Sequence, residues 1–274
     1  MDEIDDRESS SPFFLWTHYM DLHAPIHPGS ASELDDIGTI KSLFYDAGRA
    51  ARNHVPYDRL YDGALRYVDK NIGKLIEHLK DNNIWGETTL IVTGDHGEAL
   101  YDRQGVYGHP RHYHYDELLH VPLLINIPGE NGRRISAPVS LAWLHELVSD
   151  AVNIERGEFP SKSGSRDLFQ EPASKPIVSD TLDEEGHTVS VRDEQTKYIV
   201  NELTPGGDIE WDYANAHRSY LYNKDRGERN PIDRESNFLE LAESLVTLPS
   251  TLPRVDGDFD DDVEDRLRDL GYKM

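Results

Sequence analysis

One segment limits the possible fold of this chain more than any other. It is a short apolar run that ends at a glycine, followed by a carboxylate and an imidazole. Residues 88–93 read Thr-Thr-Leu-Ile-Val-Thr, and Gly94, Asp95 and His96 follow directly. A continuous apolar run of this length predicts a strand buried on both faces, as in a parallel sheet. Ligand-binding groups in open α/β sheets collect just beyond the carboxyl ends of such strands. Because Asp and neutral His bind divalent cations, this segment predicts a metal site there. The alternative is that Asp95 merely caps a following helix.

Residues 12–153 have the pattern of an α/β core. An amphipathic helix is predicted where apolar residues recur at helical spacing, and strands are predicted at short apolar runs. The expected elements are strands at 12–18, 88–93 and 121–127, helices at 60–79 and 141–152, and a helical turn at 115–120. We therefore expect a partial doubly wound, mostly parallel sheet flanked by helices.

The remainder of the chain has a different composition and residue pattern. Residues 154–175 are rich in Gly, Pro and Ser, which is typical of a linker. Residues 176–274 predict a small α+β subdomain with an antiparallel sheet. Its expected elements are a hairpin of strands 188–192 and 196–200, a third strand at 219–222 and a terminal helix at 263–270.

The charge balance excludes several partners. The 274-residue chain has 52 acidic and 28 basic residues, hence a net charge of −24, which repels nucleic acid and anionic membranes. An adaptation to concentrated salt explains this excess better than a surface for a cationic partner. The absence of cysteine excludes disulfides and a Cys nucleophile. With an acidic N-terminus and no long apolar stretch, we expect no signal peptide, no membrane span and a cytoplasmic location.

Three groups of residues could do chemistry. They are His18, Asp21 and His23 after the first predicted strand, Asp95 and His96 after the second, and His109, Arg111, His112 and His114 in the following loop. In a doubly wound sheet all three groups would converge on one edge, where they suit a cation and an anionic substrate. Taken singly, loop histidines are usually solvated side chains, and we expect this of His27, His114, His120, His145 and His187.

The order of these segments resembles the sulfatase family of the alkaline phosphatase superfamily. The matching blocks are Thr17–Pro25 with its His-x-Pro pattern, the helix 61–80, Gly94–Glu98, Gly108-His109, Tyr115–Leu124, Leu221–Asn223 and Leu267–Tyr272. Together they cover most of residues 12–272. The resemblance implies a hydrolase of sulfuric esters with a divalent cation at its active site.

The resemblance also implies roles for individual residues. Asp95 and His96 match the second pair of metal ligands, for a cation that is usually Ca²⁺, with Mn²⁺ or Zn²⁺ also compatible with a His ligand. His23 matches the histidine that assists the leaving oxygen. His109, Arg111 and His112 are alternative contacts for the sulfate, so that His109 and Arg111 are catalytic candidates. His112 and His18 are candidates for binding the substrate.

The chain departs from the family in its first catalytic block. The two acidic metal ligands and the Cys/Ser-x-Pro-x-Arg motif of the family have no counterpart, and the nearest match, Ser136-Ala137-Pro138, lacks the arginine. We expect a truncated or split sulfatase that acts on a sulfated small molecule or glycan and needs a separately encoded N-terminal half. The alternatives are a phosphodiesterase or phosphonate monoester hydrolase of the same superfamily, or a non-catalytic remnant or interaction module.

Overall fold

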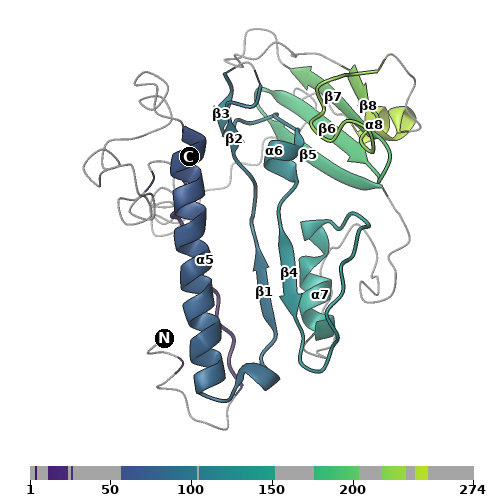
Figure 1. The fold of residues 1–274 in the computed structure, drawn as a ribbon. Helices are drawn as coiled ribbons and strands as arrows, with labels where there is room; N and C mark the ends of the chain where they lie inside the picture. Colours follow the sequence, from purple (N-terminus) through teal and green to yellow (C-terminus); the bar gives the residue numbers. More distant parts are fainter. Residues whose placement is uncertain are drawn as a thin grey trace.

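The computed structural model shows a mixed α/β protein (Figure 1). It describes residue 4, residues 12–23, residue 26 and residues 57–103, 105–151, 176–203, 217–232 and 238–245. The helices are α5 (Tyr57–Asp81), η1 (Trp85–Glu87), α6 (Asp116–Leu119), η2 (Leu141–Trp143), α7 (Leu144–Ala151) and α8 (Leu239–Leu245). The strands are β1 (Leu90–Thr93), β2 (Ala99–Leu100), β3 (Tyr107–Gly108), β4 (Leu123–Asn126), β5 (Ile177–Asp183), β6 (Gly186–Arg192), β7 (Lys197–Leu203) and β8 (His217–Tyr220).

Helix α5 confirms the amphipathic pattern and extends it at both ends. Its buried apolar residues recur at close to whole numbers of turns, on the stripe that helical spacing predicts: Leu60, Ala64, Val68 and Leu79. At the C-terminus Asn83 takes a left-handed conformation with φ 58°, and the Ile84 amide donates to the carbonyl of Leu79 at 3.0 Å. This six-to-one hydrogen bond is the Schellman ending, which satisfies a carbonyl that the helix leaves unpaired.

Strands β1 and β4 confirm the predicted apolar runs, but the predicted parallel arrangement is wrong for this pair. The strands run antiparallel, with Leu90 opposite Asn126 and Thr93 opposite Leu123. The error has a simple cause, because an apolar run records burial on both faces and carries no information on the direction of its partner. The carboxyl end of β1 therefore lies beside the amino end of β4.

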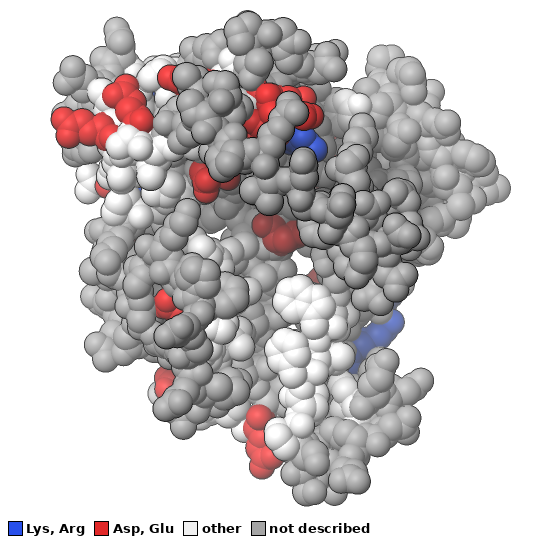
Figure 2. Space-filling view, turned by 180° about the vertical axis from the view of Figure 1, so that it is seen from behind, with Lys and Arg blue, Asp and Glu red and all other residues white. Residues whose placement is uncertain are grey.

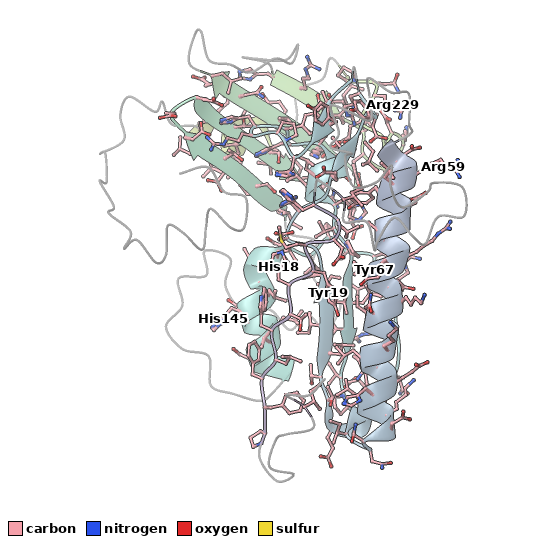
Figure 3. All side chains as sticks on the ribbon, turned by 90° about the vertical axis from the view of Figure 1, so that its left-hand side faces the viewer. His18, Tyr19, Arg59, Tyr67, His145 and Arg229 are labelled. Atoms are coloured by element: carbon pink, nitrogen blue, oxygen red, sulfur yellow. The ribbon has the colours of Figure 1, made fainter. Side chains whose placement is uncertain are left out.

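Two helices lie on opposite sides of this strand pair, as Figures 1 and 3 show from two directions. On the side of α7, Trp143 and Leu147 form a cluster against Ile91 of β1 and Ile125 of β4. The predicted helix at 141–152 is confirmed as η2 followed by α7, and the Ser140 hydroxyl accepts a hydrogen bond from the Ala142 amide at its start. The turn predicted at 115–120 is α6.

The predicted strand at 12–18 is not a strand. Residues 12–20 are extended without a ladder in the described part of the chain, and Phe14 and Trp16 are 81% and 71% exposed. A strand needs a partner as well as an apolar sequence, and the described residues offer this segment none. Figure 2 shows a band of uncharged side chains on the face seen from behind.

The C-terminal antiparallel sheet is confirmed and is larger than expected. It has the order β5-β6-β7-β8, with the predicted hairpin as β6 and β7 and the predicted third strand beginning two residues earlier, at His217. Strand β5 and helix α8 were not predicted. The side chains of β6 alternate between faces, so that Val189 and Val191 pack with Ala242 of α8, while Ser190 between them faces His114 on the other side.

Other predicted segments lie outside the described residues, namely the linker at 154–175 and the terminal helix at 263–270. The division into a core, a linker and a C-terminal subdomain thus stays a prediction. Among the described helices, none combines the length and the apolar character that crossing a membrane requires.

Candidate active site

Asp95 and His96 are exposed just beyond the carboxyl end of β1. The His96 amide donates to Asp95 Oδ1 at 2.9 Å, and His96 Nδ1 lies 2.8 Å from the carbonyl oxygen of Gly97. A carbonyl only accepts, so Nδ1 is the donor and Nε2 keeps its lone pair in the neutral ring. That nitrogen lies 3.9 Å from Asp95 Oδ2, so a carboxylate and an imidazole nitrogen face one space. No helix occurs in residues 95–103, which excludes the helix-cap alternative for Asp95.

Gly97 brings the segment after β1 into direct contact with α6. Its amide donates to the carbonyl of Leu118 at 2.8 Å. A Cβ atom at this position would lie 2.0 Å from the carbonyl oxygen of Glu117, so only glycine fits. The glycine of the motif thus anchors the residues on both sides of it, His96 and Glu98.

Glu98 pairs with His109 across the loop that separates them. His109 Nδ1 donates to Glu98 Oε2 at 3.1 Å, and the Glu98 side chain is only 5% exposed. The hydrogen bond to Glu98 is the largest influence on His109 and raises its pKa above the ordinary value, although partial burial opposes the shift. The Glu98 carboxylate therefore stabilises the imidazolium form of His109.

Three histidines from separate segments meet at this point. The rings of His96 and His109 have centroids 4.6 Å apart, and the ring of His23 lies 5.1 Å from that of His109. His23 follows a turn in which its amide donates to the carbonyl of Met20 at 3.1 Å. The predicted convergence of the three groups is thus seen for His23, His96 and His109.

The donor atoms fit a divalent cation. Ligand atoms of His96, Glu98 and His109 lie within 4.8 Å of one another. Two imidazoles with a carboxylate suit Zn²⁺ or Mn²⁺, whereas Ca²⁺ prefers six to eight oxygen ligands, of which Asp95 and Glu98 supply only part. Glu98 lies within the motif that the sequence singled out, but only the structure identifies it as a donor.

Tyr61 is a further residue that the sequence did not single out. Burial raises the pKa of its phenol, and the nearby carboxylates of Glu98 and Asp95 raise it further. Helix α5 therefore places a hydroxyl beside the acidic side of the group. Its position on the helical stripe gave no signal, because a Tyr at helical spacing is indistinguishable from a core residue.

Arg111 and His112 turn away from this group toward the C-terminal sheet. Arg111 Nη1 lies 3.2 Å from Asp183 Oδ2, and His112 Nε2 donates to Asp183 Oδ1 at 2.9 Å. His112 is buried and has φ 61°, an uncommon conformation for a residue with a side chain. Of the three alternatives for the sulfate contact, the structure brings only His109 to His96 and Glu98.

The other histidines that the sequence analysis named differ in exposure. His18 is exposed on the extended segment, and Figure 3 shows it with Tyr19 at the upper end of that segment. His145 and His120 are exposed as expected, and His145 points outward from α7 in Figure 3. His114 and His187 are buried, so the expectation of solvated side chains is wrong for them. His27 lies outside the described residues.

The sulfatase family model matches residues 1–154, more than half of the chain, and the chain belongs to the sulfatase family. It is 25% identical over 136 residues to the endo-4-O-sulfatase of Bacteroides thetaiotaomicron, a match that covers 47% of this chain and 26% of that protein. It is 49% identical over 37 residues to the bis(5'-adenosyl)-triphosphatase enpp4 of Xenopus laevis, covering 14% and 8%.

Among solved structures, the chain is similar to BT4656, which was determined in complex with its substrate D-glucosamine-2-N,6-O-disulfate. The TM-score is 0.52 at 19% identity, over 77% of this chain and 41% of that one. This likeness shows a common α/β fold. The chain spans about a quarter of the length of the endo-4-O-sulfatase and less than half of BT4656.

Proposed function

We propose that this chain carries the cation-binding and leaving-group side of a sulfatase active site. The observation that supports the proposal is the meeting of His23, His96, Glu98 and His109 from three separate segments. Chance contacts among surface residues seldom bring three imidazoles and a nearly buried carboxylate together. Membership of the sulfatase family supports sulfate ester hydrolysis as the reaction that we propose for this group.

Asp95 and His96 are the proposed cation ligands, with Glu98 beside them. A bound divalent cation would neutralise the negative charge of a sulfuryl group. Ca²⁺ is the expectation from the family, but the imidazole of His96 favours Mn²⁺ or Zn²⁺. The hydrogen bond from His96 Nδ1 to a carbonyl supports this role, since it fixes the tautomer that leaves Nε2 free for a metal.

His109 has two conceivable roles, and they differ in charge. As a neutral ring it would be a third ligand, whereas as an imidazolium it would contact an oxygen of the anionic ester. Its pairing with Glu98 raises its pKa and favours the imidazolium, so we assign it to the ester. His23, with its ring 5.1 Å from that of His109, is the proposed donor of a proton to the leaving alcohol. Arg111 and His112, which pair with Asp183, would reach the substrate only after a rearrangement.

The nucleophile is proposed to lie outside these 274 residues. The chain has no cysteine, and Ser136-Ala137-Pro138 lacks the arginine of the family's motif. The strands of the core also lack complete cover, because no residue of β1 or β4 is fully buried and Leu124 is 59% exposed. The incompletely covered strands, together with the exposed aromatic residues Phe14 and Trp16, support an N-terminal block that packs on apolar surface of this chain.

The substrate class is proposed to be a sulfated small molecule or glycan. The test mixes the full chain with a polypeptide that carries the family's N-terminal block, and measures sulfate release from a panel of sulfated sugars and aryl sulfates. Release by the mixture and by neither part alone supports the proposal. A folded complex that binds cation but releases no sulfate would instead favour the non-catalytic module.

A phosphoryl ester is the second candidate substrate. The observation that favours it is the short but high identity to a triphosphatase, 49% over 37 residues. Cation sites of this kind stabilise phosphoryl and sulfuryl oxygens alike. Comparing the turnover of an aryl sulfate, an aryl phosphate and an aryl phosphonate by the same mixture decides between the two.

A further inference from the structure

The segment that follows His109 lies along β6 with matched spacing. His112 Nδ1 is 3.0 Å from Thr188 Oγ1, and His114 Nδ1 is 3.2 Å from Ser190 Oγ. The next contact continues the series, because Arg192 Nη1 donates to the Asp116 carboxylate at 3.0 Å. Every second residue from 112 to 116 thus contacts every second residue from 188 to 192. We call these three pairs the polar ladder.

Each side chain on the loop side of the ladder also reaches a second strand. His112 donates to Asp183 of β5 at 2.9 Å, and His114 Nε2 lies 2.9 Å from Thr181 Oγ1 of the same strand. Asp116 accepts from Lys197 Nζ of β7 at 2.9 Å. The loop is therefore fixed to three strands of the C-terminal sheet.

The ladder accepts only one register. His112 and His114 are buried, and a buried polar atom that loses its partner is costly. Tyr113 and Tyr115, which alternate with them, pack with Ala99 and Leu118. A slip by one residue would bring tyrosines against the hydroxyls of β6 and histidines into the aromatic cluster.

His112 with Asp183 and Glu185 could also be regarded as a cation site, since their ligand atoms lie within 4.8 Å of one another. Arg111 argues against this reading, because its guanidinium pairs with the same Asp183 carboxylate and would repel a cation. Both ring nitrogens of His112 are already engaged, Nδ1 with Thr188 in the ladder and Nε2 with Asp183. We therefore assign these residues to positioning.

We propose that the polar ladder positions His109 against Glu98, so that the C-terminal sheet sets the geometry of the active site. His109 is three residues before His112, which forms the first pair of the ladder. The ladder therefore restricts where His109 can lie. His112, His114 and Asp116 are then positioning residues. The catalytic meaning of the inference rests on the proposed function, but the positioning of His109 can be tested without it.

The experiment records the imidazole ¹⁵N shifts of His109 in the full chain, without cation or substrate. Glu98→Gln supplies the reference signal of His109 without its carboxylate partner. Thr188→Val removes one hydroxyl of the ladder while keeping the shape of the side chain. We expect it to shift the His109 signal toward that of Glu98→Gln, and we expect Thr188→Ser to restore the wild-type signal.

Asp180→Asn is the matched control, since it alters an exposed residue of β5 and should leave His109 unchanged. Ser190→Ala tests the next rung and serves if Thr188→Val fails to fold. If the signal of His112 shifts in Thr188→Val while that of His109 stays at its wild-type position, the proposal is overturned. Because no turnover is measured, a failed sulfatase assay would leave the result standing.

Discussion

His109 Nδ1 lies 3.1 Å from Glu98 Oε2, although the two residues are eleven positions apart in the chain. The intervening loop leaves β2, returns through β3 and brings the imidazole back to the strand end where Asp95 and His96 stand. The pair combines a nearly buried carboxylate with a half-exposed imidazole. It therefore fixes the orientation of the ring on one side and leaves the other side of the ring open to a substrate.

Gly97 should be intolerant of any side chain. Gly97→Ala places a Cβ 2.0 Å from the carbonyl oxygen of Glu117. Helix α6 and the segment that follows β1 must therefore move apart. We expect the free energy of unfolding to fall by about 1–3 kcal/mol. Gly73→Ala is the control, because nothing lies within 4 Å of its Cβ and alanine favours a helix by about 0.5–1 kcal/mol. Urea denaturation measures the stability of both variants. A Gly97→Ala variant with the same denaturation midpoint as Gly73→Ala would refute the close contact.

The buried charges between α6 and the C-terminal sheet should be sensitive to the loss of one partner. Lys197 is 1% exposed, and its Nζ lies 2.9 Å from Asp116 Oδ1 and 2.5 Å from Glu228 Oε1. Lys197→Met leaves the buried Glu228 with only the longer pair to Arg103 Nη2, at 3.6 Å, at an expected cost of up to about 3–5 kcal/mol of unfolding free energy. The double variant Lys197→Met/Glu228→Gln should recover part of that loss. A double variant as unstable as the sum of both single variants would show that the two charges do not interact.

His114 should make the chain sensitive to mild acid. Burial, together with the charge of Lys197, lowers the pKa of its imidazole to about 3. The unfolded chain binds a proton there below about pH 6.5, whereas the folded chain does not. The free energy of unfolding therefore falls as the pH drops from about 6.5 toward 3, by about 1.4 kcal/mol per pH unit.

Replacement of this imidazole isolates its contribution. His114→Gln should remove that slope between pH 6.5 and 4.5, as chemical denaturation at several pH values would measure. The exposed His145→Gln should keep it. An unchanged slope in His114→Gln would mean that the imidazole titrates in the folded chain much as it does in the unfolded one.

The sequence predicted the parts of the fold that depend on apolar spacing. Helix α5 and strands β1 and β4 follow from it, because buried positions are occupied by apolar residues, at helical spacing in a helix and in a continuous run in a buried strand. Strand direction has no such pattern, so the antiparallel pairing was missed. Strand β5 was missed because its inward residues include Thr181 and Asp183, which face histidines and not an apolar core.

The candidate site was predictable to the extent that local motifs carry it. Asp95, His96, His23 and His109 stand in short patterns that mark strand ends and turns. Glu98 and Tyr61 needed the structure, because their roles depend on contacts with residues distant in the chain. Arg111 and His112 show the reverse error, since loop position alone cannot tell whether a side chain faces a substrate or a neighbouring sheet.

Cation binding by the full chain tests the central claim most directly. The measurement is the affinity for Mn²⁺, followed by electron paramagnetic resonance, in wild type, Asp95→Asn, His96→Ala and the exposed control His145→Ala. We predict binding of one ion by wild type and by His145→Ala, with a loss of about tenfold or more in Asp95→Asn and His96→Ala. Equal affinity in all four proteins, or no binding by any of them, would contradict the assignment of this group as the cation site.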